Sequence, residues 1–104
     1  MAPVPQPPTI NGFTLAPDVI TPGTCTIASW TTGGGTTRVQ LLRDNGVIWD
    51  NAPLNSSVQD CPQIPADRPL PFVIVYTLYA FNNAGQQTAR TVNLTVNNAV
   101  AIPY

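Results

Sequence analysis

The sequence predicts an all-β domain, an antiparallel sandwich or barrel of short strands. Runs of β-branched and aromatic residues recur with turn residues between them, roughly every 8 to 12 positions, and no stretch has the periodicity of a helix. The chain of 104 residues has the length of a single domain with one core. Its 12 prolines keep every apolar run well below the roughly 20 residues of a membrane-spanning helix, so we expect no membrane insertion.

Turn residues and alternation delimit the individual strands. The predicted strands are Thr9–Leu15 with a continuation at Val19–Ile20, then Thr24–Trp30, Arg38–Arg43, Val47–Asp50, Ser56–Cys61, Phe72–Phe81 and Thr88–Val96. Pro17 splits the first strand, as expected at a sheet edge. Asp44-Asn45-Gly46 predicts a hairpin turn. The continuous apolar run Phe72–Phe81 predicts a central strand, and in Thr24–Trp30 the alternation turns Thr26, Ala28 and Trp30 inward.

Proline and glycine mark the segments expected to lie outside the sheets. Residues 1–8 contain four prolines and are expected to be an extended linker. The domain would then span residues 9–98, and residues 99–104 would be a C-terminal linker or tail. Gly33-Gly34-Gly35 predicts a flexible loop. The segment from Cys61 through Pro71 contains four prolines, which predict an irregular but stiff crossing.

The charged residues exclude most kinds of chemistry. Four Arg and five Asp give a net charge of −1, which leaves no basic surface for nucleic acid. Because the chain has no His, Lys or Glu, the usual nucleophile pairs and metal ligand sets are missing. We therefore expect no enzyme activity, no catalytic residue, no cofactor and no metal site. Asp44 lies in a predicted turn, and three further aspartates lie near prolines: Asp18, Asp60 and Asp67. We expect all four side chains to stabilise turns.

Two motifs resemble those of a known family. The segments T-P-G-T-C-T-I-A-S-W, ending at Trp30, and Y-T-L-Y-A-F-N-N-A-G, starting at Tyr76, resemble the immunoglobulin-like or PKD-like repeat modules of large secreted or surface bacterial proteins. The resemblance covers about residues 8–96. It implies an immunoglobulin-like sandwich of about seven strands, A, B, C, C′, E, F and G. Ala28 departs from the family, which usually has a larger residue there.

The resemblance also assigns structural roles. Trp30 and Tyr76 belong to the family's core, and Leu78 stands where an antibody domain has its second cysteine. Tyr76, two residues before Leu78, matches the tyrosine-corner spacing, so its hydroxyl is expected to bond backbone in the Pro-rich crossing. Since strands B and E are neighbours in this fold, Cys25 and Cys61 should meet and form a disulfide, which implies an extracellular or cell-surface location. The alternative is two buried free thiols.

Two function classes remain open. The first is a structural, spacer or adhesion module whose partners are neighbouring domains or like modules, including assembly through uncapped edge strands or the apolar tail Ala99–Ile102. The second is a carbohydrate- or other ligand-binding module that uses exposed aromatics near Trp49, with Tyr79 and Phe81 as further candidates. Missing reactive residues and the proline linker favour the first class.

Overall fold

The computed structural model describes residues 6–65 and 67–97. These residues form strands and loops without a helix, and therefore contain no helix with the length and apolar character of a membrane span. The strands are β1 (Pro8–Ala16), β2 (Val19–Ile20), β3 (Thr26–Gly34), β4 (Arg38–Arg43), β5 (Gly46–Ala52), β6 (Ser56–Asp60), β7 (Phe72–Phe81) and β8 (Gln87–Val96). The all-β prediction is confirmed, and every strand overlaps a predicted range.

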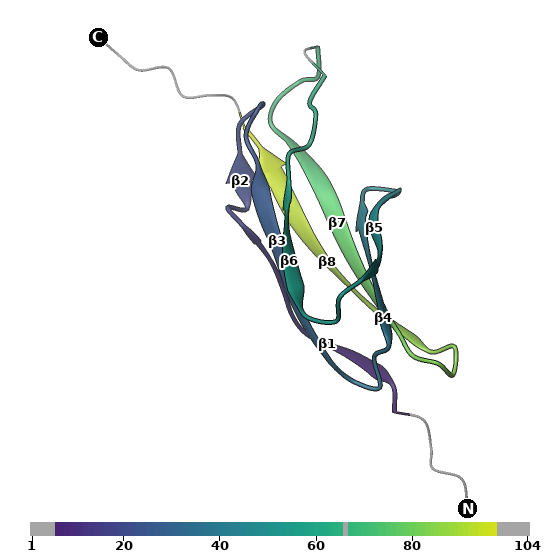
Figure 1. Ribbon diagram of the computed structural model, residues 1–104. Helices are drawn as coiled ribbons and strands as arrows, with labels where there is room; N and C mark the ends of the chain where they lie inside the picture. The colour runs from purple at the N-terminus through teal and green to yellow at the C-terminus, as the bar shows by residue number, and fades with distance from the viewer. Residues whose placement is uncertain (1–5, 66, 98–104) are drawn as a thin grey trace, which may run out of the picture.

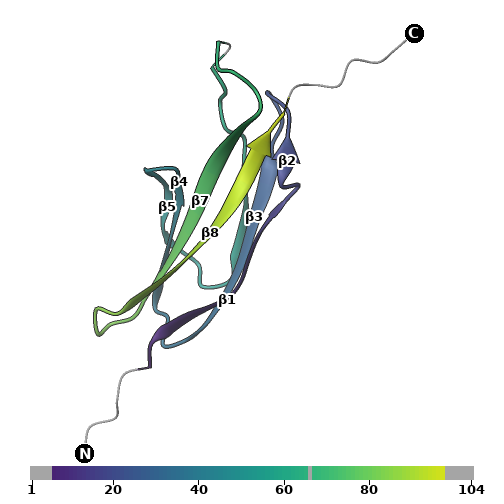
Figure 2. The ribbon, with the colours of Figure 1, turned by 180° about the vertical axis from the view of Figure 1, so that it is seen from behind.

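The strands form two sheets that give a sandwich-like arrangement (Figure 1). One sheet has the order β1-β3-β6 and the other the order β2-β8-β7-β4-β5. The view from behind in Figure 2 brings the second sheet forward, with β7 and β8 side by side. Paired strands are antiparallel, except that β2 runs parallel to β8. As its apolar run predicts, β7 lies inside its sheet, between β8 and β4.

Alternating residues from both sheets form one core. Thr26, Ala28 and Trp30 of β3 are buried, as the alternation predicts, and Tyr76 and Leu78 of β7 have no exposed surface. The apolar members are Ile10, Phe13, Leu15, Ile20, Ala28, Trp30, Val39, Leu41, Ala52, Ile74, Tyr76, Leu78, Ala80, Leu94 and Val96. Because alternate residues of a strand point to opposite faces, the intervening residues form the two outer faces of the sandwich.

The first predicted strand is divided between the two sheets, so the described residues form eight strands instead of about seven. After β1 ends at Ala16, β2 pairs with β8 in the other sheet. The amides of Thr95 and Asn97 donate to the carbonyls of Asp18 and Ile20, at 3.0 and 2.9 Å. The split at the proline agrees with the sequence, but the crossing between sheets was not predicted.

Two residues of the glycine run, Gly33 and Gly34, belong to β3, so the loop prediction is wrong for them, whereas Gly35 lies in the turn that follows the strand. β3 continues through Gly34, which has a φ of 59°, a conformation that favours glycine. A Cβ atom on Gly34 would collide with the carbonyl oxygen of Pro7, and one on Gly35 with that of Gln6. Glycine is needed here because two backbones approach each other closely.

The segment expected to be an extended linker is hydrogen-bonded to the rest of the domain at its last three residues. The carbonyl oxygens of Gln6, Pro7 and Pro8 each accept one hydrogen bond. The donors are Asn82 Nδ2 at 2.8 Å, the Gly35 amide at 3.2 Å and Thr88 Oγ1 at 2.7 Å. Pro8 is buried and is the first residue of β1. Residues 1–5 and the predicted tail 99–104 lie outside the described residues.

Cys25 and Cys61 form a disulfide, as the resemblance implied. Cys25 directly precedes β3 and Cys61 directly follows β6, and these strands are antiparallel neighbours with Thr26 opposite Asp60. The bond therefore joins the start of one strand to the end of the next. Between Cys61 and β7 the described residues form no strand, which agrees with the predicted irregular crossing.

Candidate functional site

Tyr79 and Phe81, two of the residues expected to contact a ligand, lie together on the outer face of β7. Their ring centroids are 6.0 Å apart, and the ring planes are within 24° of parallel. Opposite Phe81 on β4, Arg38 places its guanidinium carbon 4.1 Å from the centre of the ring. All three side chains are partly exposed. Together they form a stack of one cation and two aromatic rings.

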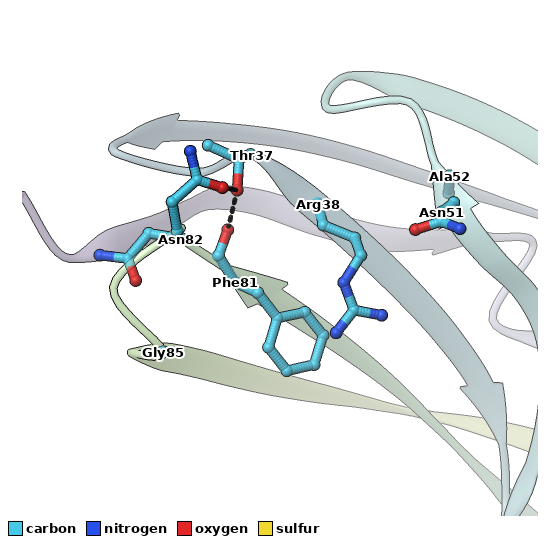
Figure 3. A pocket seen from close by; sticks show the side chains of 8 residues that line it. Thr37, Arg38, Asn51, Ala52, Phe81, Asn82 and Gly85 are labelled. Atoms are coloured by element: carbon cyan, nitrogen blue, oxygen red, sulfur yellow. Dashed lines mark hydrogen bonds between the residues drawn. The ribbon is translucent and has the colours of Figure 1, made fainter.

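A pocket of about 390 Å³ opens beside this stack, next to the end of β5 and the turn between β7 and β8 (Figure 3). Five polar residues line it together with three others: Thr37, Arg38, Asn51, Asn82 and Asn83, and Ala52, Phe81 and Gly85. The Thr37 hydroxyl lies 3.3 Å from the Phe81 carbonyl oxygen and 3.2 Å from Asn83 Oδ1, and its one hydrogen can be donated to either acceptor. Arg38 pairs with Asp50 at 3.2 Å. The pocket thus offers amides, a hydroxyl and a guanidinium beside one aromatic ring.

Trp49 lies on the other face of the sheet from Tyr79 and Phe81. It is partly buried and packs edge-on against Trp30, with ring centroids 5.8 Å apart and planes at 77°. In register it lies opposite Leu41, a fully buried residue. The three aromatics proposed for ligand binding therefore do not share one surface, and only Tyr79 and Phe81 are brought together.

Asp60 connects the two sheets through contacts that sequence reasoning missed. Its carboxylate, on β6, lies 2.7 and 2.8 Å from Nη1 of Arg43 on β4. Its Oδ2 atom also accepts a hydrogen bond from the hydroxyl of Tyr76 on β7. The Asp60 side chain is 14% exposed and that of Arg43 34%. Both charges are therefore compensated in a largely enclosed position between the sheets.

This cluster corrects two predictions. Asp60 does not serve a turn, because its carboxylate is engaged with Arg43 and Tyr76. The Tyr76 hydroxyl bonds this carboxylate and not backbone in the Pro-rich crossing. Burial raises the pKa of Tyr76 above its ordinary value, and its hydrogen bond to Asp60 raises that pKa further. The hydrogen bond to Asp60 likewise raises the pKa of Arg43.

The remaining aspartates are dispersed. Asp44 lies in the β4–β5 turn, with a φ of 52°, and its Oδ1 accepts from the Val75 amide at 3.1 Å. Asp18 and Asp67 are exposed. Within residues 6–65 and 67–97, no three His, Cys, Asp or Glu side chains gather closely enough to hold a metal ion.

Comparisons with known proteins identify no relative. The chain matches no protein-family model, no curated protein and no solved structure significantly. Its function must therefore be inferred from its own geometry and chemistry.

Proposed function

We propose that the chain is a non-catalytic structural module of an extracellular multidomain protein, with an immunoglobulin-like fold. The strand order supports this fold, because β1-β3-β6 corresponds to strands A-B-E and β2-β8-β7-β4-β5 to A′-G-F-C-C′. The motifs at Trp30 and Tyr76, which resemble bacterial repeat modules, point to the same fold. The disulfide supports an extracellular location, because such bonds persist in oxidising compartments.

The observation that carries the proposal is the path of the chain. The described chain enters at one end of the sandwich, where β1 begins, and leaves at the opposite end, where β8 ends (Figure 1). Where it enters, three hydrogen bonds hold the backbone of Gln6, Pro7 and Pro8 against the domain. A module with this path adds its own length along the chain, and the direction of the chain at Gln6, Pro7 and Pro8 is fixed by the domain.

Small-angle scattering of two copies joined end to end tests this proposal. An in-line module gives a tandem whose maximum dimension is close to twice that of one copy. A tandem that is hardly longer than one copy would mean that the modules fold back on each other. The same measurement on a tandem with Gly35→Ala, which disturbs the backbone contact at Gln6, should show a wider range of dimensions.

Carbohydrate binding is the second candidate, and the stack beside the polar pocket favours it. Sugar rings pack on aromatic side chains while their hydroxyls bond to amides and guanidinium groups, and both kinds of group meet at Phe81 and Arg38. Binding to a glycan array that is lost in Phe81→Ala but kept in Val73→Ala, on the same face of β7, would support this function. If no glycan on the array binds, the structural role remains as the single candidate function.

A further inference from the structure

The two sheets have four edge strands among the described residues, and three of these edges are protected. β1 packs against β8 and has a register shift between Ile10 and Gly12. β2 is only two residues long. The pairing of β5 with β4 shifts on both sides of Leu41. Covering elements, short strands and bulges are the usual devices that prevent an edge from pairing with another chain.

The fourth edge, β6, has none of these devices. Its five residues, Ser56–Asp60, pair with β3 in an uninterrupted register and include no proline. Its one charged side chain, Asp60, is paired with Arg43, and the exposed Ser57 and Gln59 are uncharged. In the described part of the chain no strand pairs with the other side of β6. Its outward backbone groups are therefore open to an added strand.

An apolar pocket lies beside this edge. It has a volume of about 300 Å³ and is lined from β5 and β6 by Ile48, Trp49, Val58, Gln59 and Asp60. Three of these side chains are apolar, and Arg43 already compensates the carboxylate of Asp60. A strand added to β6 can therefore place an apolar side chain between β5 and β6 without facing an uncompensated charge.

We propose that β6 pairs, antiparallel and centred on Val58, with β6 of a second copy of this chain. The two three-stranded sheets then form one six-stranded sheet, and each Val58 side chain helps to cover the pocket of the other copy. In this register Ser57 of each copy lies opposite Gln59 of the other. The two Asp60 carboxylates lie four residues apart along the pairing, about 13 Å, and each is compensated by Arg43 of its own copy, so they do not repel each other strongly.

A second copy fits this edge better than a charged partner does. The exposed positions carry no charge that would select an acidic or basic strand, and the same edge on two copies is self-complementary. A two-fold pairing also closes at a dimer. Since five residues per copy bury less than the roughly 800 Å² per partner of a standard interface, the dimer should form only at high concentration. This inference does not depend on the proposed function.

Sedimentation equilibrium of the full chain at low salt, from about 10 µM to about 1 mM, tests the pairing. Ser57→Glu/Gln59→Glu places like charges opposite each other in the proposed register and should weaken association by about tenfold or more. Ser57→Glu/Gln59→Lys, the matched control, places opposite charges there and should associate at least as tightly as the wild type. Both positions are exposed, so both variants should fold, which circular dichroism checks.

Three results would overturn the proposal. The first is a monomer over the whole concentration range. The second is equal association of the two charge variants, which would place the contact on another surface, such as the face carrying Val73. The third is loss of association when residues 98–104 are deleted, which would make that segment the occupant of the edge.

Discussion

The hydroxyl of Tyr76 donates a hydrogen bond to the carboxylate of Asp60, so a side chain of one sheet is bonded to a side chain of the other. Arg43 lies opposite Tyr76 in the β4–β7 pairing and binds the same carboxylate. The backbone hydrogen bonds between paired strands hold each sheet together, whereas this cluster joins one sheet to the other. It lies at the end of β6 next to Cys61, so the disulfide and the ion pair secure the same strand.

Replacing Tyr76 with Phe removes only the hydroxyl. We expect a loss of about 2 kcal/mol in the free energy of unfolding, because the lost hydrogen bond is made to a charged group that stays largely enclosed. Urea unfolding with the disulfide intact measures this, since urea leaves the ion pair unscreened. Tyr79→Phe, which removes a hydroxyl from the outer face, is the matched control and should change stability by less than about 0.5 kcal/mol. Equal midpoints for Tyr76→Phe and the wild type would refute the role of this bond.

The raised pKa of Tyr76 predicts a loss of stability at alkaline pH. In the unfolded chain tyrosine releases its proton near pH 10, whereas in the native protein Tyr76 keeps it. Above pH 10 the unfolded state therefore binds fewer protons, and stability falls as pH rises, by up to about 1.4 kcal/mol per pH unit. Unfolding between pH 9 and pH 11.5 should be less pH-dependent in Tyr76→Phe than in the wild type. Parallel curves for the two proteins would contradict the assignment.

Removing the disulfide should destabilise the domain strongly. The bond closes a loop of 36 residues, which in the chain-entropy model is worth about 4 kcal/mol. Cys25→Ser/Cys61→Ser, compared with the oxidised wild type in urea, measures the loss. A reduced wild type that behaves like the double variant serves as the control. A loss below about 1 kcal/mol would show that β3 and β6 are held by their pairing and the Asp60 cluster alone.

Gly35→Ala tests the contact between the glycine run and the start of the domain. A Cβ atom at this position meets the backbone carbonyl of Gln6, so we expect a loss of about 1–3 kcal/mol. Gly46→Ala is the matched control, because its nearest atom, the Arg43 carbonyl oxygen, is 3.6 Å away, an ordinary contact. Thermal unfolding compares the two variants. If both were equally stable, the residues before β1 would not be held as described.

The strands were predicted well from local patterns, because strand formation depends largely on residues that are close together in the sequence. The alternation around Trp30 and the Asp44-Asn45-Gly46 turn identified their elements, and Cys25 and Cys61 were paired through the family resemblance. The division of the first strand between two sheets was missed, because the pairing of β2 with β8 joins segments about 75 residues apart. The glycine run was misjudged for a similar reason. The glycines lie against the backbone of Gln6 and Pro7, and nothing in the sequence near Gly34 indicates this contact.

The site was less predictable than the fold. Asp60, Arg43 and Tyr76 come from three strands, and a polar residue at the end of a strand looks the same whether it caps a turn or bonds to the opposite sheet. The inward position of Trp49 depends on the register shifts on both sides of Leu41, and the sequence does not show such shifts. The pairing of Tyr79 with Phe81 follows from their spacing of two on one strand, which is why these two were found together.

Stretching single molecules between attachment points near residues 6 and 97 tests most directly whether the domain is a structural link between its two ends. We expect the oxidised protein to unfold in one discrete step, since its ends lie at opposite ends of a domain with one shared core. Reduction should lengthen that step by about 120 Å, because the 36-residue loop is released at about 3.4 Å per residue. Gradual extension without a discrete step, or a step of the same length after reduction, would contradict the structural role proposed for this module.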